Sequence, residues 1–158
     1  MKDRGVPLGY VEGLNDVRTL LADFFSILLG IDQIVLEGAH GRTLAFGPGR
    51  LESGSSAKDG GTMILTGHRD THFQFLERLH GGETLLLQTR TGRWQRFTVR
   101  DGQIVDSRTA SIDTDEEGAH LTLVTCYPFR TLTPNQPYRY VVTADRSRAD
   151  DRWSGLVR

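Results

Sequence analysis

The segment Leu121-Thr122-Leu123-Val124-Thr125-Cys126 decides how the rest of this chain is interpreted. Leucine and β-branched residues follow one another in it, and Pro128 interrupts the pattern two residues after the thiol. This pattern predicts a buried strand that ends near Cys126, the only cysteine of the 158 residues. Free cysteines are among the most buried residue types, so a structural role is the simplest interpretation. A single thiol at a strand end is also a candidate nucleophile if suitable partners exist elsewhere.

Length and composition limit the class of protein. A chain of this length fits one domain with a moderate core. The formal net charge of −1 gives no indication of a nucleic-acid partner. The 18 glycines favour a β-rich fold with tight turns. The longest apolar region, Phe24 to Leu29, is far shorter than the roughly 18 residues that a membrane span needs, and no signal peptide is visible.

One helix is expected near the N-terminus, and mostly strands after it. Asn15 is a candidate N-cap, and residues Asp16 to Phe25 have helical spacing. A second, short helix is predicted at Phe73 to Leu79. Strands are predicted at 31–36, 43–46, 62–66, 83–89, 93–99, 104–105, 121–125 and 139–143. Because the strands follow one another too closely for crossover helices, a small barrel or sandwich is favoured.

Three residues that could perform chemistry fall at the ends of predicted strands. They are His68, Cys126 and Arg139. An activated thiol can attack a carbonyl, and an imidazole can give a proton to the departing amine. A guanidinium can stabilise the negative charge that develops on the carbonyl oxygen. Together the three side chains are sufficient for acyl transfer through a thioester.

Each of these residues also has a simpler interpretation. His68 could be a loop histidine bonded to the backbone, and Arg139 could be a surface or ion-pair arginine.

His72 is the rival general acid, and its spacing of four from His68 suggests a metal pair. We do not favour zinc there, because the segment starts in a turn and no third ligand is evident. The remaining histidines are expected to be solvated: His40, His80 and His120.

Three motifs give the chain a resemblance to a known family. Residues 121–126 resemble the Thr-Leu-x-Thr-Cys signature of sortases, 66–71 resemble their histidine motif, and 137–142 resemble their catalytic-arginine strand. The order of the three motifs also fits that family. Residues 41–49, Gly-Arg-Thr-Leu-Ala-Phe-Gly-Pro-Gly, look like a segment of the sortases of Gram-negative, often marine, proteobacteria. The similarity runs from about Ile31 to Ala144.

The resemblance implies a mainly β fold: a single closed eight-stranded sortase-type β-barrel with a short N-terminal helix and one or two short connecting helices. Residues 1–30 would form the N-terminal helix and lead-in, and 31–158 the catalytic barrel. The implied activity is that of a cysteine transpeptidase. Cys126 would form a thioacyl-enzyme, His68 would exchange protons with the leaving and incoming amines, and Arg139 would stabilise the oxyanion. Thr125, by its place in the motif, would help to position the substrate.

The resemblance also implies partners and a location. One substrate would be a protein with a C-terminal Leu-Pro-x-Thr-Gly-like sorting signal, and the other an amine acceptor at the cell surface. The catalytic domain would lie in the cell envelope, on the periplasmic side. Sortases of this kind normally carry an N-terminal membrane anchor, which this sequence lacks. Either a membrane-anchored protein has been trimmed, which is the interpretation we favour, or this is an unusual member without the anchor.

No cofactor is required for this chemistry, and no metal site is predicted. The acidic residues Asp113, Asp115, Glu116 and Glu117 are interpreted as a solvated loop in preference to a calcium site.

Two other functions remain open. Water could resolve the thioester, which would make the protein a cysteine peptidase. A barrel that binds peptide or glycan without turnover is the third alternative.

Overall fold

The computed structural model describes residues 6–7, 25–28, 32–39, 41–51, 61–88, 93–114 and 118–147. Within these ranges the chain is mainly β, which confirms the predicted class. The elements are β1 (Val6–Pro7), β2 (Phe25–Leu28), β3 (Asp32–Glu37), α1 (Gly41–Leu44), β4 (Gly49–Leu51), β5 (Met63–Thr66), the 3-10 helix η2 (Gln74–Arg78), β6 (Thr84–Gln88), β7 (Trp94–Asp106), β8 (Ser111–Ile112), β9 (His120–Cys126) and β10 (Tyr138–Arg146). No helix in these ranges is long and apolar enough to cross a membrane. The predicted N-terminal helix falls outside them, except that Phe25 begins β2.

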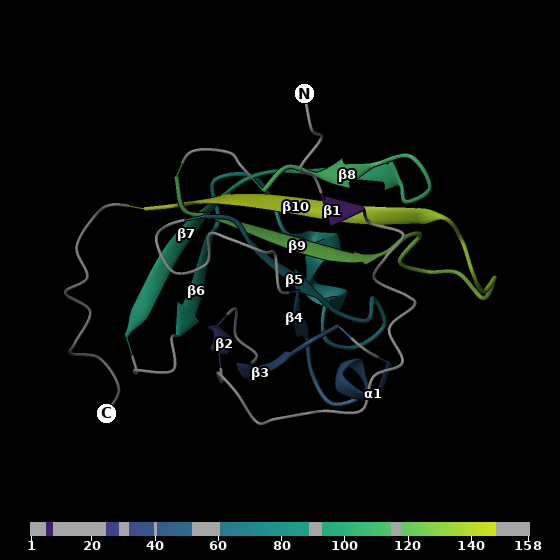
Figure 1. Cartoon of the computed structure of the whole chain (residues 1–158), viewed down its shortest axis with the longest axis horizontal. Helices are drawn as coiled ribbons and strands as arrows, with labels where there is room; N and C mark the ends of the chain where they lie inside the picture. The colour runs from purple at the N-terminus through teal and green to yellow at the C-terminus, as the bar shows by residue number, and fades with distance from the viewer. Residues whose placement is uncertain are drawn as a thin grey trace.

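The long strands pair in a closed barrel (Figure 1). Its strand order is β10-β7-β6-β2-β3-β4-β5-β9, and β9 pairs with β10 to complete the circuit. The pairs β3–β4 and β5–β9 are parallel, and the other neighbours are antiparallel. The short strands β1 and β8 pair with each other in a separate sheet. Two parallel pairs mean that the chain must cross over the barrel, which the sequence did not lead us to expect.

The segment between β3 and β4 differs from the predicted secondary structure. Residues 43–46 were expected to form a strand, but α1 covers Gly41–Leu44, and a turn follows it. The physical reason is the parallel pairing of β3 with β4, which requires a connection that carries the chain back to the same end. Strand β4, which begins at Gly49, is not among the predicted strands.

Strand β7 is longer than predicted. Residues Ile104 and Val105 were expected in a separate strand, but they continue β7, which is 13 residues long. Strand β10 pairs with β7 from Phe97 to Asp106, with one irregularity at Thr143/Ala144, and this long partner keeps β7 extended. Gly102 continues the strand opposite Val142 of β10, and a Cβ at this position would collide with the Tyr140 hydroxyl.

Alternate residues of β5, β9 and β10 enter two different apolar clusters. Leu65, Leu123 and Val142 belong to the large core cluster, which also contains Phe73 and side chains of β6 and β7. Their neighbours in the chain belong to a second cluster on the other face of the same strands: Ile64, Val124 and Val141, with Ile112 of β8. Because this part of the barrel wall is covered on both faces, β5 and β9 are buried at consecutive positions, Ile64 to Thr66 and Leu121 to Thr125.

One histidine that was predicted to be solvated is not. His120 begins β9, and its side chain is only 12% exposed. Its Nδ1 lies 2.8 Å from Oδ1 of Asp145, the residue directly opposite on β10, and Arg100 donates to the same carboxylate oxygen at 2.8 Å. Burial acts to raise the pKa of Asp145, but the hydrogen bonds from His120 and Arg100 outweigh it and hold the pKa below its ordinary value.

The β9 core positions should be essential for stability. Leu123 is fully buried, so Leu123→Ala should lower the free energy of unfolding by about 2–5 kcal/mol through lost transfer energy and the cavity left behind. Leu132 is fully exposed, and Leu132→Ala should change it by less than about 0.5 kcal/mol. Urea denaturation of both variants measures the difference. Equal stabilities would contradict the assignment of β9 to the core.

Candidate active site

The pairing of β9 with β10 brings two of the predicted site residues together. Cys126 lies directly opposite Arg139 in this antiparallel ladder, and directly opposed residues share one face of the sheet. The same face carries Val124 and Val141, two residues along each strand, so it is the face of the second apolar cluster. The thiol and the guanidinium therefore stand at the end of a dry patch of the barrel wall.

The Arg139 side chain is held rigidly. It is 5% exposed, although it is charged. Its Nη1 donates to the carbonyl oxygens of Gln136, at 2.8 Å, and of Tyr138, at 2.9 Å. These bonds compensate part of the cost of burying a charge, and they fix the plane of the guanidinium. Arg139 can therefore direct a preorganised cation at a neighbouring reactant.

His68 follows β5, and β9 holds its position through the preceding residue. The Gly67 N–H donates to the Val124 carbonyl at 3.2 Å, and the buried Thr125 hydroxyl donates to the Gly67 carbonyl at 2.7 Å. The Phe73 N–H then donates to the His68 carbonyl at 2.9 Å, so a turn starts at His68 and leaves its side chain exposed. The strand that carries the thiol thus also sets the position of the imidazole.

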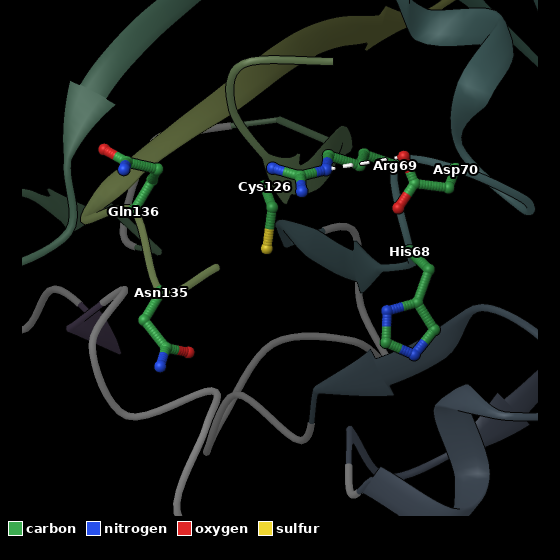
Figure 2. Close-up of a pocket in the computed structure, with 6 residues that line it drawn as sticks. All are labelled: His68, Arg69, Asp70, Cys126, Asn135 and Gln136. Atoms are coloured by element: carbon green, nitrogen blue, oxygen red, sulfur yellow. Dashed lines mark ion pairs between the residues drawn. The ribbon is translucent and has the colours of Figure 1, made fainter. Parts of the chain in front are cut away.

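Two hollows meet at the thiol. The larger, about 240 Å³, is lined by all three predicted catalytic residues. Its other lining residues are mainly small or apolar, with Ala39, Leu44 and Val124 among them. The smaller hollow, about 140 Å³, shares His68 and Cys126 with the first and is otherwise polar (Figure 2). Cys126 is partly exposed and lines both hollows.

The polar hollow, which is the smaller of the two, contains residues that are not among the predicted site residues. Arg69 and Asp70 line one side of it, and Asn135 and Gln136 line the other (Figure 2). Figure 2 shows the thiol directed into the space between Asn135 and His68. Arg69 and Asp70 immediately follow His68 in the chain, so the histidine motif itself was a signal that could have identified them. Asn135 and Gln136 lie in the loop between β9 and β10, where no sequence pattern predicted a site.

Thr125 also lines the larger hollow, but its hydroxyl is used within the protein. The side chain is 2% exposed, and its Oγ1 donates to the Gly67 carbonyl. Tyr140, directly opposite Thr125 on β10, packs against the large core cluster, so the two residues lie on the face opposite Cys126. Contact of Thr125 with a substrate stays a prediction, and the observed bond gives it a role in positioning the loop of His68.

His72 lies near His68 but lines neither hollow. The two imidazole centroids are 6.4 Å apart. Burial lowers the pKa of His72 below its ordinary value, and the nearby His68 lowers it further. Within the described ranges, no three His, Cys, Asp or Glu side chains gather as a metal site would require. Three residues of the acidic loop lie outside those ranges: Asp115, Glu116 and Glu117. The interpretation of this loop as solvated, in preference to a calcium site, therefore stays a prediction.

Known proteins are similar to this chain in sequence. Residues 28–147 match the sortase domain family. Sortase D of Bacillus subtilis (strain 168) is 34% identical over 113 residues, which cover 71% of this chain and 56% of that protein. The chain thus spans little more than half the length of this curated relative.

Solved structures share the fold at lower identity. Sortase C-3 of Streptococcus pneumoniae superimposes with a TM-score of 0.67 at 23% identity, over 92% of this chain and 74% of that chain. Sortase C-1 of Actinomyces oris gives 0.63 at 24% identity, over 78% and 72%. These matches establish a sortase fold for this chain.

The bond between Thr125 and Gly67 should control the position of His68. Thr125→Val keeps the shape of the side chain but removes the donor, which should cost about 1–3 kcal/mol of stability and shift the NMR resonances of the His68 ring. Thr125→Ser keeps the hydroxyl and should leave those resonances in place. Unchanged His68 resonances in Thr125→Val would show that this bond does not position the imidazole.

The titration of His72 should report its burial and its neighbour. Its imidazole should titrate below 6.5 by NMR, and His68→Gln should raise that pKa by removing the positive charge nearby. Because the unfolded chain binds this proton more readily, the stability contributed by neutral His72 is lost as the pH falls through and below 6.5. A pKa of 6.5 or above in the unchanged protein would contradict this environment.

Proposed function

Because the chain belongs to the sortase family, we propose that it is a cysteine transpeptidase that cleaves a C-terminal sorting signal and transfers the acyl part to an amine. The observation that supports this most is the hollow that Cys126, His68 and Arg139 line together. A nucleophile, a proton carrier and a buried cation around one space are what acyl transfer requires. The three roles, predicted from the motifs, are part of the proposal.

The proposed reaction has two halves. Cys126 attacks the scissile carbonyl as a thiolate, and Arg139 stabilises the negative oxygen of the tetrahedral intermediate. His68 gives a proton to the nitrogen as the C–N bond breaks, which leaves a thioester. The incoming amine then attacks the same carbonyl carbon, His68 takes a proton from it, and the C–S bond breaks to regenerate the thiolate.

The larger hollow suits the acyl half of the substrate. Its apolar lining, which includes Ala39, Leu44 and Val124, matches the leucine and proline of a Leu-Pro-x-Thr-Gly-like signal. Because Arg139 lines this hollow, a peptide bound there would have its scissile carbonyl close to the guanidinium. The exact motif depends on loop shapes around this hollow.

The family also suggests where the protein acts. We propose a catalytic domain in the cell envelope, outside the cytoplasm, which attaches proteins carrying sorting signals to an acceptor at the surface. The resemblance of residues 41–49 to the sortases of Gram-negative bacteria stays a prediction, because the relatives named above do not test it. No cofactor is part of the proposed chemistry.

Peptide ligation by alanine variants tests the proposal. With a pool of Leu-Pro-x-Thr-Gly-like peptides and an amine, the unchanged protein should form a ligated product that mass spectrometry detects. His68→Ala should lower its rate by about 100-fold to 10,000-fold, and Arg139→Ala by about 100-fold to 1,000-fold. Cys126→Ala should form none.

His80→Ala is the matched control for these variants. The His80 side chain is 80% exposed and lines neither hollow, so this change should leave the rate unaltered. Retention of most activity by His68→Ala or Arg139→Ala would remove that residue from the mechanism. Cleavage without ligation in the presence of several amines would favour the peptidase alternative.

A further inference from the structure

A transpeptidase has to accommodate two substrates, and this site has two hollows. Both are lined by His68 and Cys126, so both give access to the same carbonyl carbon once the thioester has formed. Only the larger one is lined by Arg139. If the acyl chain occupies the larger hollow, the polar hollow is the one left open on the other side of the thiol.

The polar hollow has the chemistry of a site for a charged, hydrogen-bonding group. Arg69 and Asp70 form an ion pair, with Nε 3.4 Å from Oδ1 (dashed in Figure 2). The Arg69 side chain is only 15% exposed, and its Nη2 also donates to the Thr131 carbonyl at 3.3 Å, which ties it to the loop that forms the opposite wall. The Arg69 guanidinium is therefore used within the protein, where it holds Asp70 and the loop of Thr131, and it is not the group that contacts a ligand.

Asp70 is the group that this hollow presents. Its side chain is 69% exposed, although it is paired with Arg69. A carboxylate accepts about four hydrogen bonds, so an ion pair with one arginine leaves capacity for another donor. Asp70 follows His68 by two residues and lines the same hollow as the imidazole. A cationic amine bound to Asp70 would therefore lie beside the residue that has to take its proton.

We propose that the polar hollow is the acceptor subsite, and that Asp70 binds the ammonium group of the incoming primary amine while Arg69 holds the carboxylate in place. This inference rests on the proposed transpeptidase function. Asn135 and Gln136, on the opposite wall, supply amide groups that can hydrogen-bond the chain that carries the amine. The ligand class is a primary amine that is positively charged at neutral pH and is attached to a polar chain.

The transfer step balances with these groups. The bound ammonium loses one proton to solvent, and the neutral amine attacks the thioester carbon as His68 takes a second proton from the nitrogen. The new C–N bond forms, the C–S bond breaks, and Cys126 leaves as the thiolate. Asp70 is neither acid nor base in this step, because its role is to concentrate and orient the amine.

A competition between two nucleophiles tests the proposal. Triglycine carries an ammonium group at neutral pH, whereas hydroxylamine is largely uncharged and attacks the same thioester to give a hydroxamate. With a sorting peptide and both nucleophiles present, Asp70→Asn should lower the ratio of triglycine product to hydroxamate roughly tenfold, the loss expected for one charge-assisted hydrogen bond. Asp70→Glu, which retains the charge, should restore most of the ratio.

Asp113→Asn is the matched control. Asp113 is exposed and lines neither hollow, so its substitution should leave the ratio unchanged. An unchanged ratio in Asp70→Asn, or the same fall in Asp113→Asn, would overturn the assignment of Asp70. If the unchanged protein formed neither product, the proposed function would fail and this inference with it, whereas hydroxamate formation with no effect of Asp70 would refute the acceptor subsite alone.

Discussion

The antiparallel pairing of β9 with β10 is the constraint on which the site depends. It places Cys126 opposite Arg139 on one face, and a slip of one residue would turn one of the two to the other face. The register is fixed because alternate residues of both strands are buried in different clusters, with Leu123 and Val142 in one and Val124 and Val141 in the other. The apolar packing of the wall therefore specifies the geometry of the polar groups at its end.

Strand β9 also reaches the third member of the site. It pairs in parallel with β5, and its last residues bond both backbone groups of Gly67. The Val124 carbonyl accepts from the Gly67 N–H, and the Thr125 hydroxyl donates to the Gly67 carbonyl. A Cβ on Gly67 would lie 2.9 Å from the Phe73 ring, so only glycine fits this close approach. Strand β9 thus carries Cys126 itself and positions Arg139 by pairing with β10. It positions His68 through its hydrogen bonds to the preceding Gly67.

The sequence predicted the parts of this arrangement that depend on local patterns. Residues 121–126 predict a buried strand because leucine and β-branched residues follow one another there, and the short motifs around His68 and Arg139 predict the candidate site. The sequence-based prediction was wrong where the local structure or burial of a residue depends on partners that are distant in the chain. Residues 43–46 have strand-forming side chains, but the parallel pairing of β3 with β4 requires a crossover, and a helix forms over 41–44. His120 looked solvated because Asp145 is 25 residues away and becomes its neighbour only through the β9–β10 register.

Detection of the covalent intermediate would show directly whether Cys126 is the nucleophile of an acyl-transfer site. Protein incubated briefly with a sorting peptide and no amine would be quenched in acid and analysed by intact and peptide-level mass spectrometry. We expect an added mass equal to the acyl fragment, carried by Cys126 and removed by hydroxylamine. Product formation without any adduct on Cys126, or turnover by Cys126→Ala, would contradict it.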